Sequence, residues 1–165
     1  FGITVAAVVA VNSLGMVVNP ATGRIWEVGL EQEHEFGEQA QRRVKLPSRP
    51  EMAVAQNTTI GIVATDAILT KVQAQKVAQM AHDGMGRAIR PTHTMFDGDT
   101  IFCLATGKKE LVEQKGFFPV PQAQALTEIG HAAADCMSRA IIHGILSARS
   151  MAGITAFCDL EDLRF

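Results

Sequence analysis

Three apolar stretches of the chain have the pattern of β-strands. The first runs from Ile3 to Val11, is rich in β-branched residues and is apolar at successive positions, as expected for a strand covered on both faces. Its alternation puts Asn12 at the end of a row of small residues on one face. The second stretch runs from Thr58 to Thr65 and the third from Thr100 to Ala105. We therefore expect these stretches to build the sheet.

Two longer segments have the period of α-helices. Thr70 and Gln73 have the spacing of an N-terminal capping box, and apolar residues follow at helical intervals until the chain reaches Pro91. A second apolar stripe predicts a helix from about Gln122 to Ala148. Because helices separate the strands in only part of the chain, the order of elements favours an α+β layered domain over a doubly wound sheet.

The connections between these elements differ in character. Asn19 to Gly23 has turn composition and predicts a hairpin that joins residues 16–18 to residues 24–26. Residues 29–56 carry many charges, few apolar side chains and two prolines, which is typical of a solvated connection. Ile154 to Cys158 is a short apolar segment that we expect to form a last strand.

Composition narrows the class of protein. The chain has 165 residues, of which 47% are hydrophobic and 19% charged, and a net charge of −2. These values indicate one globular domain and argue against a nucleic-acid partner. Cys103, Cys136 and Cys158 stand singly, as in a reducing compartment, so we expect a cytoplasmic protein. The first apolar stretch is too short for a membrane span, and the raw start at Phe1 suggests a piece of a longer protein.

The junction of Asn57 and Thr58 carries the sharpest chemical hypothesis. Thr58 opens an apolar strand directly behind a long polar segment. A threonine freed as an N-terminus carries its own base, because an α-amino group with a pKa of roughly 8 accepts the hydroxyl proton. We therefore interpret Asn57–Thr58 as a site of self-cleavage and Thr58 as a latent nucleophile. Strand initiation and an Asn-x-Thr glycosylation acceptor are the alternatives.

Two carboxylates lie one residue apart in the turn Asp97-Gly98-Asp99. Such a pair can hold an ammonium group and orient a hydroxyl, and like charges in proximity raise the proton affinity of one partner. A simple strand entry is the alternative, and the carboxylates of a calcium loop do not follow. His93 is near the turn in sequence and is a candidate for contact with it, whereas His82 and Asp83 are interpreted as a surface pair on the first helix.

Cofactor and metal signatures are absent from the sequence. Gly84-Met85-Gly86 lacks the preceding strand and the third glycine of a dinucleotide-binding loop. His131 and His143 share the long helix at a spacing that is not typical of metal ligands. We therefore expect neither a cofactor nor a metal ion.

Residues 57–67, 80–84 with 88–91, and 96–100 carry a family resemblance. They look like the L-aminopeptidase/D-esterase family and, within it, most like the nylon-oligomer (6-aminohexanoate-oligomer) hydrolases, whose junction resembles Asn57–Thr58. The resemblance implies a four-layer αββα sandwich of the N-terminal-nucleophile hydrolase type, incomplete in this chain, and a precursor that cuts itself in two. Residues 1–57, with the 29–56 linker, would end the large subunit, and residues 58–165 would be the small subunit, together one domain.

Site residues and partners follow from the same resemblance. It implies Thr58 as nucleophile and new N-terminus, Asp97 and Asp99 as carboxylates bonded to Thr58 and its amine, and Asn12 as a donor to the oxyanion. The implied substrates are short peptides or amide oligomers with a free amine. The implied partners are an upstream segment of the same protein and further copies in a homo-oligomer of cleaved pairs.

Two other functions remain open at the level of sequence. The same nucleophile would serve an acyltransferase like ornithine acetyltransferase, in which an amine replaces water as the acceptor. A non-catalytic subunit or interaction domain would keep the fold without a complete pocket. The residues favour a self-processing amide hydrolase that works through an acyl-enzyme.

Overall fold

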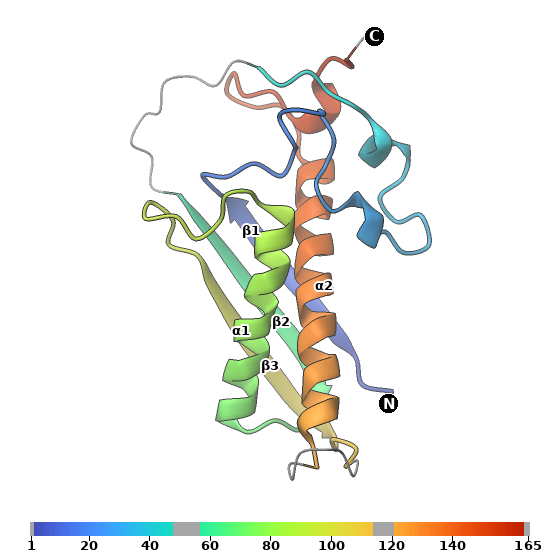
Figure 1. Ribbon diagram of the computed structural model, residues 1–165, viewed down its shortest axis with the longest axis vertical. Helices are drawn as coiled ribbons and strands as arrows, with labels where there is room; N and C mark the ends of the chain where they lie inside the picture. Colours follow the sequence, from blue (N-terminus) through green and yellow to red (C-terminus); the bar gives the residue numbers. More distant parts are fainter. Residues whose placement is uncertain (1, 48–56, 114–120, 164–165) are drawn as a thin grey trace.

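The computed structural model describes residues 2–47, 57–113 and 121–163. Their sheet consists of β1 (Val5–Asn12), β2 (Thr58–Ala67) and β3 (Thr100–Lys109), in the order β1-β2-β3 (Figure 1). β1 pairs antiparallel with β2 along its whole length, and β2 runs parallel to β3. The strands predicted from the apolar pattern are confirmed, and β3 continues past Ala105 to Lys109.

Two helices lie side by side and cover one face of the sheet (Figure 1). They are α1 (Lys71–Ala88) and α2 (Ala123–Ser147), close to the predicted limits. The capping box of α1 is confirmed. The Thr70 hydroxyl accepts a hydrogen bond from the Gln73 N–H, and the Gln73 side chain accepts one from the Thr70 N–H.

The hydrophobic core lies between the helices and the sheet. Val63 of β2, Met85 of α1 and Met137 of α2 are among its fully buried members. Gly84 lets the two helices approach closely, because a Cβ there would collide with the backbone of Ala134 in α2. The helix pair and the sheet therefore pack as two adjoining layers.

The opposite face of the sheet is open in the described part of the chain. Side chains alternate along β2, so Val63 is 1% exposed whereas Ile60 and Ile62 are 48% and 45% exposed. The large exposed apolar side chains on this face are those of Val8, Ile60, Ile62, Phe102 and Leu104. β1 is thus covered on one face, not on the two that its composition predicts. The α+β class is confirmed, in the incomplete form of the sandwich, with one helix layer and one sheet layer.

Most of residues 29–47, the described part of the expected connection, are exposed, as the composition of the segment predicts. The 3-10 helices η1 (Val28–Leu30) and η2 (Glu38–Gln41) lie in or at the edge of this segment. Phe36, Ala40 and Val44 are buried in the core, whereas Leu30 and Leu46 are half-buried. The spacing of four between the three buried residues anchors this otherwise polar segment to the core. Residues 48–56 lie outside the described residues.

An ion-pair cluster fastens this segment to α2. Glu35 accepts hydrogen bonds from Arg139 at 2.5 and 2.8 Å and contacts His143 Nε2 at 3.0 Å. The hydrogen bonds from Arg139 outweigh the effect of burial and lower the pKa of Glu35 to about 2. The carboxylate is therefore charged and paired at neutral pH.

The predicted hairpin is present as a turn with a single bridge. Val18 pairs with Ile25, and the Asn19 N–H donates to the Arg24 carbonyl at 2.7 Å. The turn is therefore where the composition places it, but its arms are too short to count as strands.

The predicted last strand is wrong. Phe157–Asp159 forms the 3-10 helix η3. The Ala156 N–H donates to Ser150 Oγ at 2.9 Å, and Ser150 Oγ donates to Asp159 at 2.5 Å. These local side-chain bonds take the place of a ladder with a neighbouring strand.

Two buried threonines of β2 allow a matched test of stability. Thr59 Oγ is buried without a hydrogen-bond partner among the described residues, whereas Thr65 Oγ accepts a hydrogen bond from the Ala67 N–H. Thr59→Val removes an unsatisfied polar atom and should raise the free energy of unfolding by about 1 kcal/mol. Thr65→Val should lower it by about 1 kcal/mol or more, because it leaves a buried N–H unpaired. Denaturant unfolding measures both, and a loss of stability in Thr59→Val would contradict the assignment.

Candidate active site

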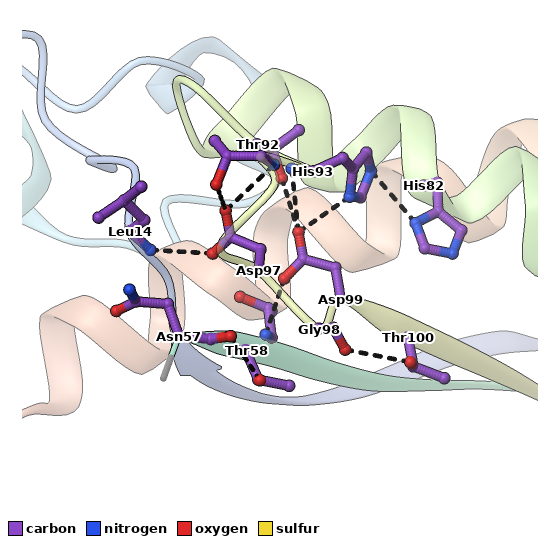
Figure 2. Close-up of polar contacts among 12 residues, drawn as sticks. Leu14, Asn57, Thr58, His82, Thr92, His93, Asp97, Gly98, Asp99 and Thr100 are labelled. Atoms are coloured by element: carbon purple, nitrogen blue, oxygen red, sulfur yellow. Dashed lines mark hydrogen bonds and ion pairs between the residues drawn. The ribbon is translucent and has the colours of Figure 1, made fainter. Parts of the chain in front are cut away.

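The Asn57–Thr58 junction lies where the ends of all three strands meet (Figure 2). Thr58 is the first residue of β2 and stands opposite Asn12, the last residue of β1. Asn57 forms a bridge with Asp97, just before β3. Alternation along the strands places Thr58 and Asn12 on the open face of the sheet, with Ile60. The structure thus gathers residues that are far apart in the sequence.

The carbonyl oxygen of Asn57 accepts two hydrogen bonds. One comes from Thr58 Oγ at 2.5 Å and the other from the Gly98 N–H at 3.0 Å. A Cβ on residue 98 would lie 3.0 Å from Thr58 Oγ, so glycine lets the turn approach the hydroxyl. The carbonyl that self-cleavage would attack is therefore polarised by two donors.

Asp97 ties the loop after β1 to the loop before β3. Its Oδ1 accepts a hydrogen bond from the Leu14 N–H at 3.1 Å, and its Oδ2 accepts bonds from the N–H and hydroxyl of Thr94 at 3.1 and 2.5 Å. Burial raises the pKa of this carboxyl, but the hydrogen bonds from Thr94 and Leu14 outweigh burial and leave the pKa lowered. Asp97 is therefore a charged anchor at neutral pH.

Asp99 is the most enclosed carboxylate of the site, with a side chain 4% exposed. Oδ1 accepts from the Thr59 N–H at 2.8 Å, next to the junction. Oδ2 accepts from the Thr92 hydroxyl at 3.2 Å, from the His93 N–H at 3.1 Å and contacts His93 Nδ1 at 2.8 Å. Asp99 therefore fixes the start of β2 against the loop that leads to β3 (Figure 2).

A pair of histidines extends this network to α1. His82 Nδ1 lies 3.2 Å from His93 Nε2, and His93 in turn contacts Asp99 (Figure 2). Burial and the nearby His93 lower the pKa of His82, although Asp99 and Asp83 act in the opposite direction. His93 contacts the turn, as its place in the sequence indicates. The contact of His82 with His93 was missed, because no spacing rule links a helix residue to a loop eleven positions later.

The structure brings all five predicted site residues to one end of the sheet: Asn12, Asn57, Thr58, Asp97 and Asp99. The carboxylates of Asp97 and Asp99 accept hydrogen bonds from backbone N–H groups and from side chains of the loop before β3. Thr58 Oγ donates to the carbonyl of Asn57. The roles implied by the resemblance stay predictions. Gly98 was not among the predicted site residues, although its position between two aspartates is visible in the sequence.

A comparison with protein families decides the relationship. The family model described as peptidase family S58 matches residues 1–157. The chain belongs to peptidase family S58. Thr58, Asp97 and Asp99 all lie inside the matched region.

Relatives in family S58 carry amide-hydrolase names. An uncharacterized aminopeptidase of Mycobacterium leprae is 44% identical over 96% of this chain and 45% of its own length. A 6-aminohexanoate-oligomer endohydrolase of Kocuria sp. is 28% identical over 85% of this chain and 40% of its own. The solved L-aminopeptidase D-Ala-esterase/amidase of Ochrobactrum anthropi matches at 25% identity and a TM-score of 0.47, over 64% of this chain and 30% of that one. The chain spans less than half the length of the curated relatives named here.

Two cysteine thiols of this S58 chain are unreactive at neutral pH, and its described residues form no metal site. Burial raises the pKa of the Cys103 and Cys136 thiols, which keeps them protonated at neutral pH. Within residues 2–47, 57–113 and 121–163, no group of three or more His, Cys, Asp or Glu side chains is arranged to hold a metal ion. The helices of the described chain are all too short or too polar to cross a membrane.

The histidine pair predicts a pH dependence of stability. Because the folded protein lowers the pKa of His82 below its usual 6.5, this residue stabilises the fold above pH 6.5, and the contribution is lost as the pH falls below that value. His82→Gln should therefore lose less stability than the unmodified protein between pH 7 and 5, measured as the denaturation midpoint in urea. Val72→Ala, at an exposed and non-titratable position of α1, is the control and should keep the original pH slope. Equal slopes in all three proteins would contradict the assignment.

Proposed function

We propose that this family S58 chain carries the nucleophile and the cleavage site of a self-processing amide hydrolase. The observation that carries the proposal is the position of Thr58, whose Oγ lies 2.5 Å from the carbonyl oxygen of Asn57 at the start of β2. Membership of a peptidase family supports the class of reaction. A threonine that merely opened a strand would not require the glycine of the turn to pack against its hydroxyl.

In the first reaction, Thr58 Oγ attacks the carbonyl carbon of Asn57. A C–O bond forms, the C–N bond between the two residues breaks, and the hydroxyl proton passes to the departing nitrogen, which becomes the Thr58 amine. Water then hydrolyses the ester, leaving a carboxylate on Asn57 and a free hydroxyl on Thr58. Because β2 holds the hydroxyl beside the carbonyl, the reacting atoms need little rearrangement.

In the second reaction, the same hydroxyl attacks the amide of a substrate. The Thr58 amine, with an ordinary pKa of roughly 8, accepts the Oγ proton and delivers it to the leaving amine. Water then resolves the acyl-enzyme. Asn12, opposite Thr58, would donate its side-chain N–H to the oxyanion, and Asp97 and Asp99 would order the surroundings of the new amine.

The proposed substrates are short peptides or small amide oligomers with a free amine. The names aminopeptidase and 6-aminohexanoate-oligomer endohydrolase, borne by relatives in Mycobacterium leprae and Kocuria sp., support this range. Thr58 is on the open face of the sheet, so whatever packs on that face would complete the walls of the pocket. We also propose a cytoplasmic homo-oligomer of cleaved pairs, for which the free state of the three cysteines supports the location.

Self-cleavage has a direct mass signature. The unmodified protein should resolve into two chains, of which the smaller begins at Thr58. Thr58→Ala should remain a single chain because it has no nucleophile, whereas Thr58→Ser should still be cut. Thr59→Val is the matched control, because it alters the neighbouring threonine, whose hydroxyl is buried on the other face of β2, and it should be cut like the unmodified protein. Intact-mass analysis measures the cleavage of all four proteins. An unmodified protein that stays uncut would contradict the proposal.

The two products should stay together after the cut. β1 precedes the junction and β2 follows it, and they pair over the whole of β1, from Val5 opposite Thr65 to Asn12 opposite Thr58. The contacts of Glu35 with Arg139 also cross between the products. We expect the fragments to co-elute in size-exclusion chromatography and to separate only in denaturant. Separation under native conditions would show that cutting dismantles the site.

A further inference from the structure

We propose that the backbone N–H of Gly98 is the oxyanion donor for cleavage of the Asn57–Thr58 bond, and that Asp97 and Asp99 are the positioning residues that hold it there. The inference rests on the proposed self-cleavage. It assigns a catalytic role to a residue that motif reasoning passes over, because a backbone N–H carries no side-chain signature.

The donor is in place before the reaction begins. The Gly98 nitrogen lies 3.0 Å from the carbonyl oxygen of Asn57. When Thr58 Oγ bonds to the carbonyl carbon, the π electrons of the C=O bond move to that same oxygen, which becomes negatively charged. Donors that stabilise such an oxyanion lie about 2.7–3.1 Å from the position that it will occupy, and the Gly98 N–H already donates to this oxygen before the charge develops. The Thr58 hydroxyl gives up its proton in the reaction, whereas the Gly98 N–H remains a donor throughout.

The residues on both sides of Gly98 are held by their carboxylates. Asp97 is tied to the Leu14 N–H and to Thr94. Asp99 is tied to the Thr59 N–H, one residue beyond the scissile bond. The N–H between them is therefore fixed with respect to the Asn57 carbonyl, and little reorganisation is needed as charge develops.

The same geometry explains why a glycine stands between the two aspartates. A Cβ at residue 98 would lie 3.0 Å from Thr58 Oγ, closer than an ordinary van der Waals contact. Any side chain would therefore press on the nucleophile from the side on which the N–H has to approach. The sequence Asp-Gly-Asp thus combines two anchors with a backbone that passes beside the hydroxyl.

Replacement of Gly98 by glycolic acid tests the inference. This change turns the amide between residues 97 and 98 into an ester, which removes the N–H and adds no side chain. The whole protein is made by cell-free translation with a suppressor tRNA, and conversion of precursor to cut chains is followed by intact mass. We expect the rate of cutting to fall by about 100-fold, the usual effect of removing one oxyanion donor.

Two further esters serve as controls. The Gly23 N–H donates to the carbonyl of Asn19 at 2.8 Å, so glycolic acid at residue 23 removes an equivalent bond far from the junction. The α-hydroxy analogue of Phe96 removes the bond from the Phe96 N–H to the Thr94 hydroxyl oxygen at 3.3 Å, within the same loop. Both proteins should be cut at the rate of the unmodified protein, and the melting temperature of each reports on folding.

The outcomes separate the inference from the function on which it rests. Slow cutting in the residue 98 ester alone supports the donor. Cutting of that ester at the unmodified rate overturns the donor and leaves self-cleavage standing. Equal slowing in the residue 96 and 98 esters shows that the loop as a whole is required, and also overturns the donor. An unmodified protein that is never cut, or a Thr58→Ala protein that is, removes the proposed function and the inference with it.

Discussion

A carboxylate withdrawn from water has to be surrounded by donors, and the candidate site depends on how Asp99 meets this requirement. Its donors come from Thr59 at the start of β2 and from Thr92 and His93 in the loop after α1. Satisfying one buried anion therefore fixes three parts of the chain relative to one another. The Asn57–Thr58 peptide lies directly beside this fixed point, which explains how a bond at the end of a strand can be held in one geometry.

The residues that stabilise the fold and the residues that are proposed to react lie on opposite faces of the sheet. The core between the helices and the sheet contains residues from both sides of the junction, and β1 pairs with β2 across it. Cutting Asn57–Thr58 would thus break one covalent link and leave the packing in place. Thr58, the proposed nucleophile, lies on the other face of the sheet, where Ile60 and Ile62 are exposed. Whatever covers the open face would form the walls of a pocket on that side, and the sheet itself would form its floor.

Patterns that depend on side chains near in sequence were readable, and contacts that depend on backbone groups were not. The capping box of Thr70 and Gln73 was predicted from its spacing, whereas the bonding of Asp97 and Asp99 to Thr58, which the family resemblance implies, stays a prediction. The partners of the aspartates were not predicted, because most are N–H groups that every residue except proline possesses. Within residues 29–47, the burial of Phe36, Ala40 and Val44 was missed because a count of apolar side chains ignores their spacing of four.

The family resemblance implies that both Asp97 and Asp99 bond to Thr58 and its amine, but the hydrogen bonds of the two carboxylates indicate different roles. A carboxylate has about four lone-pair sites, and Asp99 already accepts from the Thr59 N–H, the Thr92 hydroxyl, and both the backbone and the ring of His93. It has little capacity left for an ammonium group. Asp97 accepts three hydrogen bonds, from the Leu14 N–H and from the N–H and hydroxyl of Thr94, so more of its acceptor capacity is left. An ammonium group formed at Thr58 would therefore find a free acceptor site more readily on Asp97 than on Asp99.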